Sequence, residues 1–139
     1  MRRRRKSREF ALQVLYQLDI TQQDATRTLT QFQEHFSTSG DRDHFLERLV
    51  MGVLEHRKEI DQLIKQYSEH WRLDRMTIID RNILRMATFE LLYFKEIPPK
   101  VTLNEAIDLG KRFGSEDSGS FINGILDRIQ KEAVRKPIQ

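Results

Sequence analysis

The chain has 139 residues, with 24 Lys and Arg, 21 Asp and Glu and no cysteine, and its formal net charge at pH 7 is +3. Its length suffices for one hydrophobic core, and 38% hydrophobic with 32% charged residues is typical of a globular rather than a disordered protein. The lack of cysteine excludes disulfides and thiolate chemistry, and no apolar run approaches the ~20 residues of a membrane span. We therefore expect one domain, located in the cytoplasm, with no membrane partner.

The positive charge is concentrated at the N-terminus. Without the basic residues of this end, acidic residues outnumber basic ones in the chain. A guanidinium group keeps its charge near neutral pH and can donate two parallel hydrogen bonds to one phosphate, so a polyanion, above all nucleic acid, is the first candidate partner. The basic residues are Arg2, Arg3, Arg4, Arg5, Lys6 and Arg8.

Apolar residues recur at helical spacing throughout, and β-branched alternation is nearly absent, so the sequence predicts an all-α fold. In the first half we expect a helix over about 6–20 and another over about 25–36. Asp41 is the expected N-cap of a third helix, and a fourth is expected to end near Trp71.

The second half is expected to begin at Thr77, which forms a capping-box-like pattern with Asp80. The helix that follows is the most apolar in the chain and carries apolar residues around much of its circumference. We therefore expect it to be central, and two prolines, Pro98 and Pro99, are expected to end it.

Two more helices complete an expected total of seven. Thr102 and Glu105 form a full capping box at the start of the sixth helix, and Gly114 stands where a C-terminal cap glycine is expected. The last helix is expected over about 118–133.

The sequence shows no pattern typical of an enzyme. The four histidines are scattered without an H-E-x-x-H arrangement, and the segment 110–114 lacks the residue order of a phosphate-binding loop. We expect no catalytic residue, no metal and no cofactor.

On a helical wheel Arg5, Arg8, Leu12 and Tyr16 share one edge of the first helix, beside its core-facing stripe. Guanidinium groups and a tyrosine ring would then line one partly exposed strip. Phosphate contacts can hold a strand while an aromatic ring stacks an unpaired base, which is worth ~1–3 kcal/mol per base. This combination favours single-stranded RNA as the ligand.

Other interpretations of the strip remain open. The basic run could be a solvated tail, and Tyr16 could lie at the edge of the core. Anionic lipid is less favoured because the first helix has no exposed apolar face left to insert. Duplex DNA is less favoured because no helix-turn-helix with a polar recognition helix is evident.

Several motifs, taken in their order and spacing, resemble the NusB family of bacterial transcription antitermination factors over nearly the whole chain. Residues 20–60 carry little of this resemblance. The motifs are Arg4-Arg5-Lys6-Ser7-Arg8-Glu9 with Leu15-Tyr16, Asp80-Arg81-Asn82-Ile83-Leu84-Arg85, Val101-Thr102-Leu103-Asn104-Glu105-Ala106, Phe113-Gly114-Ser115-Glu116-Asp117-Ser118 and Phe121-Ile122-Asn123-Gly124-Ile125-Leu126-Asp127.

The resemblance implies two packed helical subdomains, 1–71 and 72–139, and a non-enzymatic role. It implies that the protein pairs with the small-subunit ribosomal protein NusE. The pair would bind the boxA element of nascent RNA and would help the RNA polymerase antitermination complex to pass terminators on ribosomal RNA operons.

The resemblance also implies site residues. Arg4, Arg5 and Arg8 match the arginine-rich RNA motif of the family, and the neighbouring Arg2, Arg3 and Lys6 are candidates because the run begins directly after Met1. The remaining matches are Tyr16, Asp117 and Phe121 toward RNA, and Asp80, Arg81 and Leu84 toward the protein partner.

Structural roles are open for some of these residues. Asp117 could cap the last helix, Phe121 could be buried, and Asp80 could serve only its capping box. We expect the pairs Asn104-Glu105 and Asn123-Gly124 to be structural, the first as a cap and the second by allowing helices to pack closely.

A second class of function is a helical interaction scaffold or homodimer that aids ribosome assembly, with a basic end that is not sequence-specific. A homodimer could also cover the arginine strip. An RNA-binding module of a methyltransferase is a third interpretation, and it is less favoured because we see no catalytic domain before the chain ends at Gln139.

Overall fold

The computed structural model describes residues 2–36, 43–68 and 73–134, and all regular elements in these ranges are helical. The prediction of an all-α fold with seven α-helices is confirmed for the described residues. A short 3-10 helix, η1 (Leu73–Arg75), precedes α5, and a π-helical turn, η2 (Gln130–Val134), follows α7. The α-helices are α1 (Arg2–Thr21), α2 (Ala25–Phe36), α3 (His44–Glu55), α4 (Arg57–Tyr67), α5 (Ile78–Tyr93), α6 (Pro99–Phe113) and α7 (Ser118–Ile129).

Helix α1 begins at Arg2, earlier than expected, so the basic run is helical rather than a tail ahead of the helix. Arg and Lys are good helix formers, and the early helix is tied down by Ser7, whose hydroxyl donates to Asp43 Oδ2 over 2.6 Å. The helix ends where Gln22 adopts a positive φ of 58°. The cations of the N-terminus therefore have fixed positions around a helix.

The N-cap of α3 is Asp43 and not Asp41, so that prediction is wrong; Asp41 itself lies outside the described residues. The Asp43 carboxylate accepts from the Leu46 backbone N–H over 3.0 Å as well as from Ser7. It therefore caps α3 and joins it to α1.

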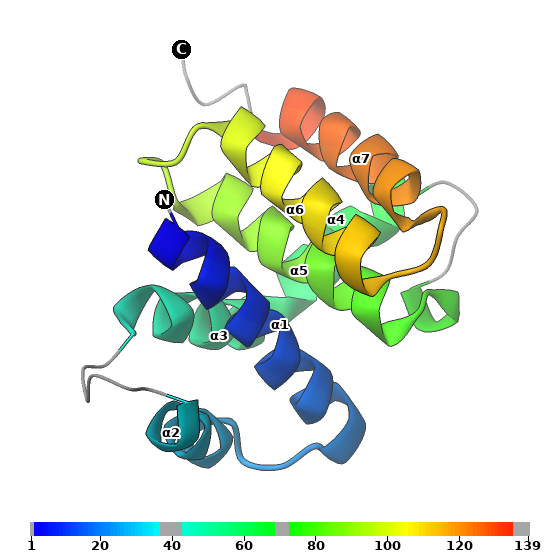
Figure 1. Cartoon of the computed structure of the whole chain (residues 1–139). Helices are drawn as coiled ribbons and strands as arrows, with labels where there is room; N and C mark the ends of the chain where they lie inside the picture. Colours follow the sequence, from blue (N-terminus) through cyan, green and yellow to red (C-terminus); the bar gives the residue numbers. More distant parts are fainter. Residues whose placement is uncertain (1, 37–42, 69–72, 135–139) are drawn as a thin grey trace.

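Helix α5 is the central element, as predicted. It packs against α1, α3, α4, α6 and α7, and α4 also packs against α7 (Figure 1). Thr77 is its N-cap, and the Thr77 hydroxyl accepts from the Asp80 backbone N–H over 3.0 Å. The Asp80 carboxylate does not complete the box, because its buried Oδ1 has no hydrogen-bond partner in the described structure.

Helix α6 begins at Pro99, so the predicted capping box at Thr102 and Glu105 is wrong. Proline is well suited to the first turn of a helix because its missing N–H would be unpaired there. Helix α5 has already ended at Tyr93, ahead of the prolines. Thr102 and Glu105 are instead interior residues of α6 whose side chains contact α1 and α5.

The structure confirms one expected role of a glycine and contradicts another. Gly114 caps α6 as predicted, with an extended backbone (φ −97°, ψ −158°), and glycine fits because a Cβ would collide with Ser118. Gly124 does not allow close packing of helices, because no described atom of another helix lies within 4 Å of where its Cβ would be. The packing role expected for Asn123-Gly124 is therefore wrong.

The core is one cluster with buried residues from α1 to α7. The expected subdomain boundary near Trp71 falls at residues 69–72, outside the described residues, so the division into 1–71 and 72–139 stays a prediction. Across the part of the chain that is described, none of the helices is both long and apolar enough to cross a membrane.

Candidate nucleic-acid interface

The basic residues of α1 fall into different environments. Arg3, Arg5 and Lys6 are exposed, whereas Arg4 is half-buried with its guanidinium carbon 5.0 Å from the centroid of the Phe45 ring. The side chain of Arg2 lies outside the described part of the structure. The first two turns of α1 thus present at least three cations to solvent.

Arg8 has a different environment from the one expected. Its side chain is buried, with 4% of the residue exposed, because this position of α1 faces α5. The guanidinium makes a two-pronged ion pair with Glu90, from Nε to Oε2 over 2.7 Å and from Nη2 to Oε1 over 2.8 Å. The Thr102 hydroxyl donates to the same carboxylate over 3.0 Å. Arg8 therefore joins α1, α5 and α6, and the expectation that it is exposed on the strip is wrong.

Arg5 keeps most of its side chain in water but also has a carboxylate partner. Its Nη2 lies 2.9 Å from Glu105 Oε2 and its Nε lies 3.2 Å from Oε1. The hydrogen bonds that Arg5 donates to the Glu105 carboxylate, together with the negative charge of that carboxylate, raise the pKa of Arg5 above its ordinary value. The guanidinium is permanently charged and accessible to a ligand.

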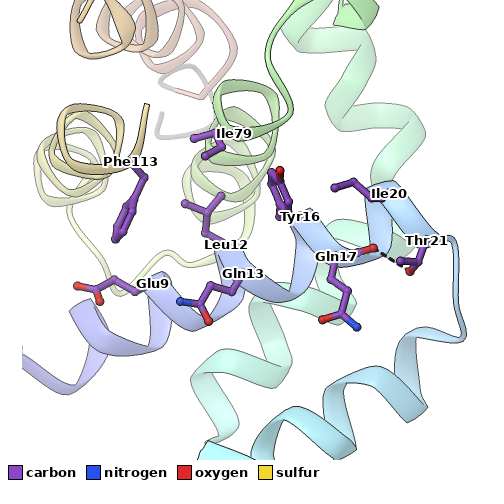
Figure 2. A pocket seen from close by; sticks show the side chains of 9 residues that line it. All are labelled: Glu9, Leu12, Gln13, Tyr16, Gln17, Ile20, Thr21, Ile79 and Phe113. Carbon is purple, nitrogen blue, oxygen red and sulfur yellow. Dashed lines mark hydrogen bonds between the residues drawn. The ribbon is translucent and has the colours of Figure 1, made fainter. Parts of the chain in front are cut away.

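Tyr16 lies in an apolar groove rather than beside guanidinium groups. The groove has a volume of about 470 Å³ and lies between α1, the start of α5 and the end of α6 (Figure 2). Three of the five large apolar side chains exposed in the described structure line it: Tyr16, Ile20 and Phe113. The continuous arginine–tyrosine strip predicted from the helical wheel is wrong, because buried Arg8 and Leu12 separate Arg5 from Tyr16.

Asp117 and Phe121 lie at the start of α7. Asp117 is exposed and is the N-cap residue of α7, as the capping alternative expected, although its side chain makes no cap hydrogen bond within the described residues. The Ser118 hydroxyl accepts from the Ser115 backbone N–H over 2.9 Å instead. Phe121 is half-buried against the core. Asp117 is therefore available to a ligand, and Phe121 is available in part.

The residues expected to face a protein partner are largely internal. Leu84 is fully buried in α5, so the expectation that it forms part of a partner surface is wrong. Asp80 is 6% exposed, and Arg81 donates from Nε to Asp19 Oδ2 over 2.9 Å. The partly buried Ile79 of this turn lines the apolar groove.

Asp19 is a residue that the sequence did not reveal. Its Oδ2 accepts from Arg81, from Asn82 Nδ2 over 3.0 Å and from Arg85 Nη1 over 3.2 Å. Burial by itself would raise the pKa of Asp19, but the hydrogen bonds from Arg81 and Asn82 and the charges of Arg81 and Arg85 lower it to about 2. The one hint in the sequence was the spacing of Arg81 and Arg85, which lie one turn apart on α5 and can therefore bind the same carboxylate.

Arg112, in the last turn of α6, is a second residue that the sequence did not single out. Its Nη1 donates to Glu9 Oε2 over 2.7 Å, and its guanidinium carbon lies 4.9 Å from the centroid of the Phe113 ring. The cationic surface of α1 thus extends onto α6. In the described ranges no group of three or more His, Asp or Glu is placed to hold a metal ion.

Comparison with known proteins gives a consistent result. Residues 5–131 match the model of the NusB family. The chain is 48% identical to the transcription antitermination protein NusB of Syntrophus aciditrophicus strain SB over 136 residues, which is 98% of this chain and 84% of the relative.

Two solved structures are similar over nearly the whole chain. NusB from T. maritima is 40% identical and has a TM-score of 0.83, with 96% of this chain and 94% of that chain covered. A chain of a crystal structure of antitermination factors NusB and NusE in complex with double-stranded RNA is 30% identical and has a TM-score of 0.82. The match covers 94% of this chain and 98% of that one.

The all-α fold presents a cationic first helix with an apolar groove beside it, an arrangement that suits a binding protein. The chain belongs to the NusB family, which is a family of non-enzymatic transcription antitermination factors.

Proposed function

We propose that this protein is a cytoplasmic, RNA-binding transcription antitermination factor that binds a boxA-type single strand together with a NusE-like ribosomal protein. The observation that carries the proposal is the set of exposed cations on the first two turns of α1, namely Arg3, Arg5 and Lys6. Its setting is the antitermination complex of RNA polymerase on ribosomal RNA operons.

The RNA surface is formed by charges that a helix holds at fixed spacing. Each phosphate that Arg3, Arg5 or Lys6 neutralises releases counterions, which contributes ~0.7 to the slope of log affinity against log salt for a single strand. Arg4 adds a further cation, which a cation–π contact with the Phe45 ring holds in position. Arg8 contributes indirectly, because its pair with Glu90 holds α1 in place.

The protein partner is proposed to occupy the apolar groove lined by Tyr16, Ile20, Ile79 and Phe113. A groove that exposes several large apolar side chains suits a protein surface better than an RNA backbone. Ile79 directly precedes the turn at Asp80, to which the motif resemblance assigns the partner contact. The similar chain was solved in complex with both NusE and RNA, which supports separate surfaces for a protein partner and for RNA.

Tyr16 stays a candidate for RNA stacking, as do Asp117 and Phe121 for contacts beside the RNA. If Tyr16 serves the groove, Tyr16→Ala should weaken binding of the ribosomal partner and leave RNA binding by the protein alone unchanged. If Tyr16 stacks a base, the same change should weaken RNA binding without the partner and leave the salt slope nearly unchanged. Unfolding of this variant would identify Tyr16 as a core residue.

The experiment is a fluorescence anisotropy titration of a short boxA-type RNA, a scrambled RNA and the boxA duplex, each with and without the ribosomal partner. We expect selective binding to the boxA strand that strengthens with the partner. Arg5→Gln should reduce both the affinity and the salt slope. Lys131→Gln is the matched control, because Lys131 is an exposed cation paired with Asp127 on α7.

Equal, weak binding to all three RNAs would contradict the proposal. A helical scaffold with a non-specific basic end would then be the better interpretation. Concentration-dependent self-association that buries the groove, seen by sedimentation, would identify a homodimer as the occupant instead.

A further inference from the structure

Two ion pairs join α1 to α6 in a reciprocal arrangement. Arg5 of α1 pairs with Glu105 of α6 over 2.9 Å, and Arg112 of α6 pairs with Glu9 of α1 over 2.7 Å. Each helix therefore provides one cation and one carboxylate. We call the surface formed by these two pairs, between α1 and α6, the seam. Figure 2 shows the α1 side of the second pair, with Glu9 opposite Phe113 at the end of α6.

The two members of each pair differ in exposure. The side chains of Arg5 and Arg112 are 56% and 42% exposed, whereas those of Glu105 and Glu9 are 15% and 14% exposed. The carboxylates form the floor of the seam, and the guanidinium groups lie above them in contact with solvent. An incoming anion would meet the cations first.

The carboxylates compensate the charge of this surface. Glu9 Oε1 also lies 3.7 Å from Lys6 Nζ, and Glu105 Oε1 lies 3.8 Å from Arg8 Nη1. The hydrogen bonds that Arg5 and Arg112 donate to Glu105 and Glu9, respectively, raise the pKa values of both arginines, so each cation stays charged beside its carboxylate. A phosphate approaching the seam therefore meets nearly neutral pairs rather than free arginines.

Carboxylate and phosphate bind guanidinium through the same parallel hydrogen bonds, so they compete for one set of donors. Exposed ion pairs contribute little to folding, which means that a phosphate can displace the carboxylate without unfolding the seam. We propose that Glu105 and Glu9 are internal competitors for RNA backbone phosphate at Arg5 and Arg112, and that Arg112 is a further phosphate-binding residue of the interface. This inference rests on the proposed RNA-binding function.

The consequence is selectivity. A weakly held polyanion cannot displace both carboxylates, whereas an RNA anchored elsewhere on the protein can displace them one pair at a time. Removing a competitor should therefore raise affinity most for RNAs that lack the specific sequence, and the discrimination between boxA-type and scrambled RNA should fall.

A double-mutant cycle on RNA affinity isolates the competition. Arg5→Gln should reduce affinity for the boxA-type RNA, and the loss should be several-fold larger in the Glu105→Gln background than in the wild type. The reason is that only the wild type has to break the pair before Arg5 can bind phosphate. Glu105→Gln alone should raise affinity and increase the salt slope by about 0.7.

The same cycle with Glu9→Gln and Arg112→Gln tests the second pair. Asp127→Asn is the matched control for the added net charge, since Asp127 of α7 pairs with Lys131 of η2 in an exposed ion pair. This control should leave RNA affinity nearly unchanged. Circular dichroism of every variant should confirm that the helical content is retained.

Three results would overturn the inference. Equal losses from Arg5→Gln in both backgrounds would mean that Glu105 does not compete. A larger loss in the wild type would mean that Glu105 positions Arg5 for RNA. No effect of Arg112→Gln in either background would remove Arg112 from the interface. In each case the wild type still binds RNA, whereas failure of the proposed function would appear as absent or unselective binding by the wild type itself.

Discussion

At the scale of single residues, the arginines of α1 perform different tasks although the sequence presents them as one run. Arg8 is buried, donates from Nε and Nη2 to Glu90 and lies over the Phe45 ring, whereas more than half of the Arg5 side chain is exposed to water. The buried pair is surrounded by low-dielectric core, so neither partner can lose the other without leaving an uncompensated charge. Burial, and not residue type, separates the structural arginine from the binding one.

This difference predicts unequal effects on stability. Arg8→Ala should destabilise the fold by about 3–5 kcal/mol, because Glu90 would remain charged and buried without its partner. Arg5→Gln should change the free energy of unfolding much less, since its side chain is exposed. Urea denaturation of both variants measures this, and equal midpoints would show that the Arg8–Glu90 pair contributes little.

Asp19 predicts a dependence of stability on pH. Its pKa is about 2 in the folded protein, below the ordinary value of 3.8, so the folded state binds the proton less readily than the unfolded state. The stabilisation, up to about 2 kcal/mol, is therefore complete above pH 4 and is lost as the pH falls toward 2. The difference in unfolding free energy between the wild type and Asp19→Asn should shrink over this range; a difference independent of pH would contradict the assignment.

At the scale of helices, one glycine inside α3 and one inside α7 have opposite surroundings. Gly52 of α3 lies against the Phe89 ring of α5, and a Cβ at Gly52 would overlap that ring. Gly124 of α7 has open space around it in the described structure. Both are glycines inside helices, where glycine is otherwise unfavourable, so their environments should decide the effect of adding a methyl group.

Gly52→Ala should destabilise the fold by about 1–3 kcal/mol, since α3 or the ring must shift. Gly124→Ala should stabilise it by about 0.5–1 kcal/mol through helix propensity. Thermal unfolding of the two variants provides the comparison, each serving as the control for the other. If both substitutions stabilised the protein, the Phe89 ring would have to move aside without loss of stability.

At the scale of the molecule, α5 connects elements from both halves of the chain. Arg8 and Thr102 meet on Glu90, and Arg85 of α5 contacts Asp61 of α4 over 2.9 Å and Asp19 of α1 over 3.2 Å. The buried apolar residues also form one cluster. The proposed subdomains therefore share a core and a set of ion pairs.

We expect one cooperative unfolding transition because neither half can keep its core without α5. Far-ultraviolet circular dichroism and the fluorescence of the single tryptophan should give the same urea midpoint. Two separated transitions would instead show that residues 1–71 and 72–139 unfold as independent units.

The sequence by itself determined the all-α class and most of the helices. The apolar period of 3.6 residues predicts the span of α2 and the central place of α5, and the local pattern of Thr77 with Asp80 predicts the cap, because these depend on neighbours within a turn or two. The basic run and the motif order likewise indicated the RNA-binding class.

Only the tertiary structure decided which side chains meet. The partners Arg8 and Glu90 are 82 residues apart, and Arg5 and Glu105 are 100 residues apart, so helical spacing gives no information about either contact. For this reason Glu105 was predicted as a cap, Arg8 as an exposed contact and Arg112 not at all. The apolar groove beside Tyr16 likewise exists only once α1, α5 and α6 have packed, because each helix supplies part of its lining.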